Sequence, residues 1–494
     1  MVPPDGSLPG GVVKREGLLA VAALLAAGIL AAAGAAWLRQ RGAASADPGS
    51  RLPTHGLLIS FRGDDLGATM PALGDSPVYR QLIGTRMSVK VRRELRWGPS
   101  LPIPWSSLPL AAPSAVGLYR KGWIVVRPAA AADPASSRER GEGTWSLFAS
   151  DASFLPRPDA ARKGPGPPLR RGEIELELDG AAWGGATAGT RGELETLLPR
   201  RAAGRLLVER GHLRERWEIT CGTGCLLDLL DPAGSAGVEA RGWAALPDAT
   251  AAVAWFRLDP GRLADAGRAE SGASGIPALT RLEQLERFLG IPLRQEMAAA
   301  LAGPGVAALV ETESASDPRL FLALDLADPE RARRALNRIA ALGVLSGAIR
   351  ERPYRGVSIA SWASGSRSSG IEPAAAVDGG LLLLALRTAD IADAIDRLRA
   401  PARRASAGLR DEIAALPLGA WRAVSRSASL TAEWEKILGG DAPGTNAEPT
   451  RATLRKEGDR WILEGSGSAP SFAADPLLPS IRRLLRATID RERP

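Results

Sequence analysis

Among the residues that could do chemistry, cysteine and histidine occur only twice each in this chain. Cys221 and Cys225 form a C-x-x-x-C motif, a spacing short enough to close a small disulfide loop in an oxidising compartment. Free thiols and a metal or redox site are the alternatives. Two thiolates are too few ligands for a structural zinc site, and the nearest histidine is His212. Since His55 is the only other histidine, triads and multi-histidine metal centres are nearly excluded, and we predict a disulfide with no metal and no cofactor.

Other motifs that could carry a reaction fail on inspection. Gly74-Asp75-Ser76 is typical of the nucleophile block of one esterase family, but Pro77 follows it and no late Asp-x-x-His supplies a base. The glycine-rich segments 303–305 and 365–370 lack the signatures of phosphate-binding loops. Paired carboxylates are recognised only within a fold, so a carboxylate-dependent hydrolase stays open. We predict no catalytic residues and no enzyme.

Tryptophan and arginine together indicate a recognition surface. The chain has 13 Trp against 3 Tyr, and three tryptophans fall near arginines in a Pro-rich neighbourhood. Aromatic and arginine side chains suit the recognition of glycans or proteins. The candidate surface consists of Trp97, Trp105, Trp123, Arg96, Arg120 and Arg127. The alternative is that these tryptophans are buried in strands.

The elements that must position these residues follow an uncharged segment, 17–37, bounded by Gly17 and Trp37. As a helix it would be about 30 Å long, the thickness of the hydrocarbon core of a bilayer. It predicts a transmembrane anchor after a stub at 1–16, although the small-x-small sequence at 44–46 leaves a cleaved signal peptide open. Basic residues on its two sides balance, so orientation depends on the layout of a short stub before a large domain. We predict a single-pass protein of the bacterial inner membrane, in contact with the lipid bilayer, with its large C-terminal domain in the periplasm.

Length and charge limit the number of domains and the classes of partner that the rest of the chain can have. The 494 residues are 45% apolar, enough for two or three domains with real cores. The net charge is +8, but the arginines are spread along the chain among Asp and Glu, which favours a solvated surface and predicts no nucleic-acid partner. We predict a linker at 38–51, a first α+β domain at 52–235 with mobile Pro/Arg-rich loops, a second α+β domain at 240–475, and an amphipathic C-terminal helix at 476–494.

Two stretches of the chain begin and end alike. Leu52-Pro53 precedes an apolar strand, as does Leu246-Pro247, and the segments 205–220 and 450–465 each form two alternating strands around a Gly turn. Arg-Trp opens the second strand of both hairpins, at 216–217 and 460–461. The order of these matches predicts an internal duplication, although hairpins of this kind are also common in antiparallel α+β chains.

The second half has the most readable secondary structure. Strands are expected at 306–311, 320–326 and 381–386, and helices at 276–302, from Asp328-Pro329 onwards, and at 391–398. Asp328 is the expected N-cap of its helix, with Pro329 at the first helical position. The predicted fold class is α+β: an N-terminal transmembrane helix followed by two duplicated domains, each an antiparallel sheet with helices packed on one face.

Several short motifs in the second half carry a resemblance. They are Leu289-Gly290-Ile291-Pro292-Leu293, Asp328-Pro329-Glu330-Arg331-Ala332, Tyr354-Arg355-Gly356-Val357 and Val377-Asp378-Gly379. Over about 246–400 the chain resembles an uncharacterised family of bacterial membrane-anchored extracytoplasmic proteins, a domain of unknown function. The resemblance implies a protein exported from the cytoplasm. Its motifs define caps and turns, so they imply no catalytic residues.

These observations favour a membrane-anchored extracytoplasmic binding, scaffold or assembly protein of the bacterial envelope, with another envelope protein as partner. The first alternative is a carrier of a hydrophobic ligand such as a lipid, and the second is a carboxylate-dependent hydrolase of the cell wall or its glycans. A continuous apolar pocket would favour the carrier, and a cleft with two facing carboxylates the hydrolase. Shallow grooves would favour the scaffold.

Overall fold

The computed structural model describes residues 47–63, 66, 113–119, 122–129, 139–142, 145–151, 169, 173–179, 200–209, 212–221, 226–233, 237–247, 249–265, 286, 292–310, 319–345, 349–362, 372–400, 407–426 and 448–467. The predicted stub at 1–16, the segment 17–37 and the C-terminal helix at 476–494 lie outside these residues. Most of the predicted linker lies outside them as well.

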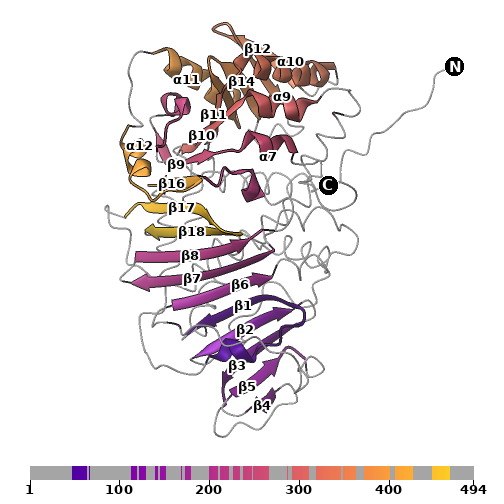
Figure 1. Cartoon of the computed structure of the whole chain (residues 1–494), viewed down its shortest axis with the longest axis vertical. Helices are drawn as coiled ribbons and strands as arrows, with labels where there is room; N and C mark the ends of the chain where they lie inside the picture. Colours follow the sequence, from indigo (N-terminus) through magenta and orange to yellow (C-terminus); the bar gives the residue numbers. More distant parts are fainter. Residues whose placement is uncertain are drawn as a thin grey trace, which may run out of the picture.

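A single antiparallel sheet runs the length of the molecule (Figure 1). Its eighteen described strands are β1 (Leu57–Gly63), β2 (Ser114–Tyr119), β3 (Trp123–Pro128), β4 (Glu139–Glu142), β5 (Trp145–Ala149), β6 (Glu173–Asp179), β7 (Arg201–Glu209), β8 (His212–Thr220), β9 (Thr250–Arg257), β10 (Leu301–Val310), β11 (Arg319–Leu326), β12 (Ile349–Tyr354), β13 (Val357–Trp362), β14 (Ala374–Asp378), β15 (Leu381–Ala385), β16 (Trp421–Ser425), β17 (Thr450–Glu457) and β18 (Arg460–Gly467). The hydrogen-bonded pairs place them in the order β4-β5-β3-β2-β1-β6-β7-β8-β18-β17-β16-β9-β10-β11-β15-β14-β13-β12.

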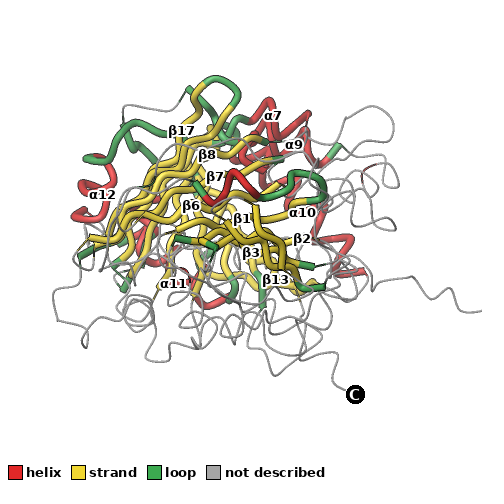
Figure 2. Tube along the Cα trace, turned by 90° about the horizontal axis from the view of Figure 1, so that it is seen from below, coloured by secondary structure: helices red, strands yellow, loops and turns green. Residues whose placement is uncertain are grey.

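Helices cover both faces of the second half of this sheet (Figure 2). The described helices are the 3-10 turns η1 (Pro48–Arg51), η4 (Leu226–Leu229) and η5 (Arg241–Ala245), and the α-helices α7 (Pro260–Asp265), α9 (Leu293–Ala300), α10 (Pro329–Leu345), α11 (Thr388–Arg399) and α12 (Ala407–Ala414). Strand β15 shows why both faces are covered. Its Leu381 and Leu383 pack with α11, whereas Leu382 packs with α10 on the opposite face. A continuously apolar strand has to be buried on both sides.

The predicted fold class is therefore wrong. The described chain is mostly one large antiparallel sheet, not two α+β domains with helices packed on one face. The sheet continues from the first half into the second because β8 and β18 pair, from Leu213 opposite Gly467 to Thr220 opposite Arg460. Without this pairing, β8 and β18 would each leave an edge of unpaired backbone N–H and C=O groups. A local sequence pattern does not specify which two strand edges pair.

The single-pass transmembrane helix was part of that predicted fold class, and this prediction is corrected with it. Within the part of the chain that the structure describes, no helix has the length and apolar character needed to cross a membrane.

Several local predictions agree with the structure, and one helix boundary does not. The backbone amide of Arg331 donates to Asp328 Oδ1 over 2.9 Å, so Asp328 is the N-cap of α10 as expected. The helix expected to run to residue 302 ends earlier, because β10 begins at Leu301. Gly303 has a φ of +103° within a shift of the β10 register between Leu301 and Gly305. The glycine pair therefore marks a bulge rather than a loop.

The two halves repeat one order of strand pairing. Strand β1 lies between β2 and β6, which leads to β7 and β8; strand β9 lies between β10 and β16, which leads to β17 and β18. A 3-10 turn precedes each central strand, and the residues that end these turns, Leu52 and Leu246, are both buried. The predicted internal duplication requires such a repeat. Because β8 and β18 pair antiparallel, the hairpins β7-β8 and β17-β18 meet at the junction with opposite strand directions.

A buried carboxylate from the sheet caps η5. Asp325 on β11 accepts hydrogen bonds from the backbone amides of Arg241 over 2.9 Å and Gly242 over 3.4 Å. The residue at the N-cap position of η5, Ala240, makes no such bond. Burial raises the pKa of Asp325, and the two amide bonds offset that rise only in part. The position of η5 against the sheet is thus coupled to the charge of one side chain.

We expect the free energy of unfolding of the wild type, relative to that of Asp325→Asn, to fall as the pH rises above about 4. The pKa of Asp325 is raised in the folded state. Its contribution to stability is therefore complete below the unfolded pKa and is lost as the pH rises through the folded pKa. Asparagine keeps the acceptor oxygen but does not titrate, so the difference isolates this group. Urea unfolding followed by tryptophan fluorescence measures it, and a flat or rising difference would contradict the prediction.

Candidate functional site

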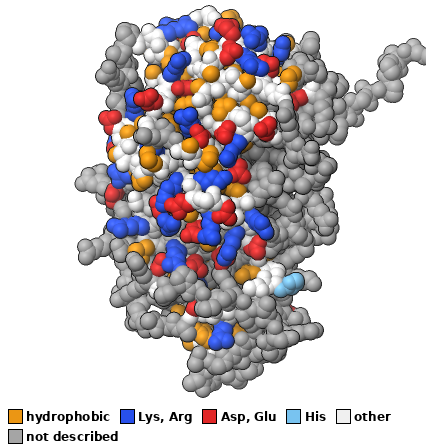
Figure 3. All heavy atoms as spheres, in the orientation of Figure 1, with side chains coloured by type: hydrophobic (Ala, Val, Ile, Leu, Met, Phe, Trp, Pro, Cys, Tyr) orange, Lys and Arg blue, Asp and Glu red, His pale blue; other side chains and the backbone are white. Residues whose placement is uncertain are grey.

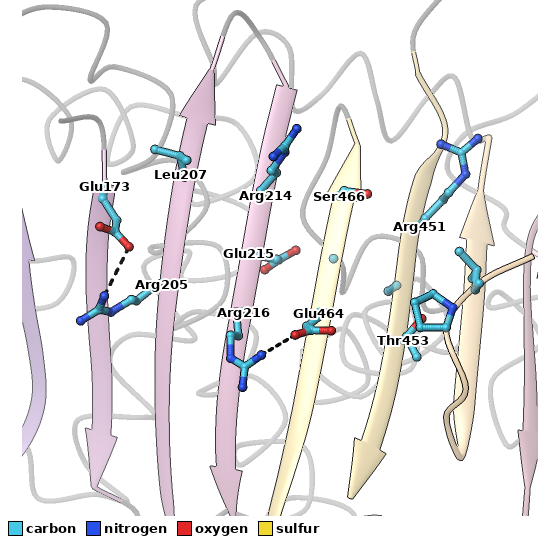
Figure 4. Close-up of a pocket in the computed structure, with 14 residues that line it drawn as sticks. Glu173, Arg205, Leu207, Arg214, Glu215, Arg216, Arg451, Thr453, Glu464 and Ser466 are labelled. Atoms are coloured by element: carbon cyan, nitrogen blue, oxygen red, sulfur yellow. Dashed lines mark hydrogen bonds and ion pairs between the residues drawn. The ribbon is translucent and has the colours of Figure 1, made fainter. Parts of the chain in front are cut away.

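A groove of about 530 Å³ lies where the two halves of the sheet meet (Figure 4). We call it the junction groove. Its floor is formed by β6, β7, β8, β18 and β17, and the loop between α12 and β16 forms part of its rim. The residues that line it are Glu173, Arg205, Leu207, Arg214, Glu215, Arg216, Leu416, Pro417, Arg451, Ala452, Thr453, Glu464, Gly465 and Ser466.

Strand register brings most of these side chains to one face of the sheet. Two rows of directly opposed residues cross the five strands. The first row is Glu173, Leu207, Arg214, Ser466 and Arg451, and the second row is Glu175, Arg205, Arg216, Glu464 and Thr453. Because side chains alternate between faces with a period of two, residues in equivalent positions of the two rows lie on the same side.

Ion pairs neutralise the second row. Arg205 contacts Glu175 over 3.4 Å and reaches Glu173 of the first row over 3.7 Å. Arg216 donates to Glu464 over 2.5 Å, across the junction between the halves (Figure 4). These side chains are partly exposed, so each pair contributes at most about 1 kcal/mol to stability. Their effect is to hold the charged side chains of the floor in place.

The first row carries positive charge that the described residues leave largely unneutralised. Arg214 is exposed and has no hydrogen-bond or ion-pair partner among the described residues. Arg451 reaches one described carboxylate, that of Glu448, over 3.5 Å, and Glu448 is itself 54% exposed. Ser466 lies between the two arginines, and Figure 4 shows all three at the same end of the groove.

The rim of the groove is apolar. Leu416 and Pro417 line it, and the next residue, Leu418, is 61% exposed. Leu207 on β7 adds an apolar side chain directly opposite Arg214 on β8. By contrast, acidic and basic side chains are interspersed over the middle of the molecule in the view of Figure 3. An exposed apolar loop beside a charged floor is typical of a contact surface.

The carboxylates of the groove are engaged in other contacts. Glu173 pairs with Arg205 and Glu464 with Arg216, while Glu215 accepts a 2.7 Å hydrogen bond from the indole of Trp217. Among the residues described, no group of three or more His, Cys, Asp or Glu is placed to hold a metal ion. The geometry offers donors and ion pairs for binding.

The predicted Trp and Arg surface is only partly within the described residues. Trp123, on β3, stacks on Phe148 with ring centroids 5.9 Å apart, and Arg127 lies on the same strand. Trp97, Trp105, Arg96 and Arg120 lie outside the described residues. The ring of Trp123 is partly buried, and the recognition surface stays a prediction.

Cys221 is disulfide-bonded. It packs against the buried cluster of Ala420, Leu454 and Trp461, as do Leu227 and Leu230. Cys225 lies outside the described residues, so its pairing with Cys221 stays a prediction.

Sequence reasoning missed the junction groove. A signal was present, because β8 alternates charged residues at Arg214, Arg216 and Glu218, the pattern of a strand with one solvated face. That pattern identifies an exposed face but does not identify the strand beside it. The partner strand β18 comes from the far end of the described chain.

Comparisons with known proteins add distant structural matches. No family model matches the chain, and no curated protein sequence matches it significantly. Three crystal forms of TP0453 match it: form I at 10% identity over 49% of this chain and 96% of that chain, with a TM-score of 0.24; form IV at 10% over 50% and 97%, with 0.25; and form III at 9% over 49% and 98%, with 0.25. At these TM-scores the similarity assigns neither fold nor function to this chain, and the family resemblance noted in the sequence stays a prediction.

Proposed function

We propose that this protein is a non-catalytic binding protein of the bacterial envelope and that its partner docks in the junction groove. One observation carries the proposal. The groove combines a charged floor, fixed by ion pairs such as that of Arg216 with Glu464, with an apolar rim at Leu416 and Pro417, next to the exposed Leu418. Contact surfaces gain affinity from apolar anchors and specificity from charges that are already positioned.

The disulfide state of Cys221 supports a location outside the cytoplasm. Disulfides persist in oxidising compartments such as the periplasm and are rare in the cytosol. Cys221 packs against the buried cluster that contains Trp461, so the bond belongs to the folded structure.

The carrier and hydrolase alternatives receive less support. A carrier of a fully apolar ligand needs an apolar cavity, whereas the junction groove is lined by four arginines and three glutamates. A glycoside hydrolase needs one carboxyl as acid and a second facing it across the substrate. The described carboxylates of this groove contact arginine or tryptophan instead.

Site-specific photocrosslinking tests this proposal. A photoreactive amino acid at Leu418 should form an adduct with one envelope component of the native host. The same probe at Arg352, an exposed residue of the edge strand β12, should not form that adduct. The substitution Ser466→Trp, which fills the groove between Arg214 and Arg451, should abolish the Leu418 adduct while circular dichroism shows an unchanged fold. Equal adducts at both positions, an adduct that survives Ser466→Trp, or no adduct at Leu418 would refute a partner in the groove.

A further inference from the structure

We infer that Arg214, Ser466 and Arg451 form an oxyanion subsite that binds a phosphate group of the groove's ligand. The inference rests on the proposed function, because it assigns a ligand chemistry to the same groove. The three residues are consecutive members of the first row, on β8, β18 and β17. Adjacent strands are about 4.8 Å apart, so the two arginine backbones are separated by about 10 Å with the serine midway. Arginine side chains on this spacing can converge on one group above Ser466.

The charge balance of the groove points to an anion at this position. Arg205 and Arg216 in the second row each contact glutamate. Arg214 has no such contact among the described residues, and Arg451 has a single 3.5 Å contact with an exposed glutamate. Arg214 and Arg451 lie on the same face with β18 between their strands, so their like charges repel each other across about 10 Å. An anion held between these two arginines would neutralise them.

The donor geometry favours phosphate over carboxylate. A guanidinium group offers a planar fork that binds phosphate or carboxylate through two parallel hydrogen bonds. A carboxylate has two oxygens, which one fork can occupy. A tetrahedral phosphate has further oxygens for a second fork and for the hydroxyl of Ser466. Two forks with a hydroxyl between them therefore match a phosphate group best.

Apolar side chains also line the groove around the subsite. Leu207 lies next to Arg214 in the first row, and Leu416 and Pro417 line the groove from the loop between α12 and β16, whose Gly419 lies against Thr453 on β17. A ligand that places its phosphate over Ser466 would lay its remaining atoms against one of these apolar walls. The expected ligand is therefore a phosphate ester with an apolar substituent.

Calorimetric titration of the full chain at low salt tests the subsite, with phenyl phosphate, inorganic phosphate and benzoate as probes. We expect phenyl phosphate to bind more tightly than either of the other two. Arg214→Ala and Arg451→Ala should each weaken its binding about tenfold or more, the cost of a lost charge-assisted hydrogen bond. Arg214→Lys keeps the positive charge but loses the planar fork of donors. Its affinity for phenyl phosphate should therefore lie between that of the wild type and that of Arg214→Ala. The matched control is Arg201→Ala, which removes an arginine that is 62% exposed and paired with Glu177 outside the groove lining; it should leave the affinity within about twofold.

Three results would overturn the subsite: no phenyl phosphate binding by the wild type, equal or tighter binding of benzoate, or unchanged binding in the Arg214→Ala/Arg451→Ala double variant. If one of these occurs while the Leu418 adduct still forms, the subsite is refuted and the proposed function stands. Loss of the adduct refutes the proposed function itself.

Vesicles of phosphatidylglycerol in phosphatidylcholine identify the source of the phosphate. Vesicle binding that the double variant loses supports a lipid headgroup, and phenyl phosphate binding without vesicle binding supports a soluble ester.

Discussion

Replacing Trp461 with alanine should lower the free energy of unfolding by about 3–5 kcal/mol, the range for large aromatic truncations in a core. Trp461 on β18 is 0% exposed and packs with Ala420 and Leu454, with Cys221 at the edge of the cluster. Its indole donates to Asp228 over 3.4 Å, and the ammonium of Lys456 lies 5.3 Å from the ring centroid. The substitution would leave a cavity and remove both polar contacts.

Trp217 is the matched control, because the repeat places it at the equivalent position of the other hairpin. Its ring is partly exposed and lies against Gly204 on β7, where a Cβ atom would come within 2.2 Å of the ring. Trp217→Ala should cost at most about 2 kcal/mol, since less surface returns to water. Urea unfolding monitored by circular dichroism compares the two variants. Equal losses would show that the two tryptophans are not buried as the structure describes.

Replacing Arg62 with alanine should lower the free energy of unfolding by about 3 kcal/mol, because it breaks a buried ion-pair network from one side. Arg62 on β1 is 5% exposed, and its guanidinium contacts Glu175 over 2.5 Å and Asp47 over 2.9 Å. Burial lowers the pKa of Arg62, but the hydrogen bonds and charges of Glu175 and Asp47 outweigh it and raise the pKa overall. Without the arginine, the mostly buried carboxylates of Glu175 and Asp47 would lose the cation that both contact. Asp47 also accepts a 2.9 Å bond from the amide of Gly49, so η1 would be affected as well.

Arg201→Ala is the control for the Arg62 experiment. Arg201 also pairs with a glutamate of β6, but it is 62% exposed, so its loss should cost under about 1 kcal/mol. Raising the salt concentration should reduce the Arg201 effect more than the Arg62 effect, because exposed pairs are screened more strongly than buried ones. Chemical denaturation at low and high salt gives both quantities. If the two variants lose the same stability, the buried network does not contribute as proposed.

Local elements of the fold could be predicted where the signal lies within a few residues. The N-cap at Asp328 and the two hairpins that contain Trp217 and Trp461 follow from capping chemistry, turn glycines and alternation. The sequence predicts the end of a helix at residue 302, where the structure has a bulge at Gly303, because an isolated glycine pair suits either structure. The repeat of the Arg-Trp pair gave no indication that one tryptophan would be buried and the other partly exposed. The difference in burial between the two tryptophans depends on which residues of each half pack against its hairpin.

By itself, the sequence determined that this chain forms antiparallel hairpins and that several strands carry one charged face, and its two histidines nearly exclude triads and multi-histidine metal centres. Only the tertiary structure decided that β8 and β18 join the halves into one sheet, and that Arg214, Ser466 and Arg451 stand side by side. The physical reason is that alternation specifies which face a side chain occupies but not which strand edge will pair. Edges carry the same backbone donors and acceptors whatever their sequence. The candidate site therefore exists only in the folded chain.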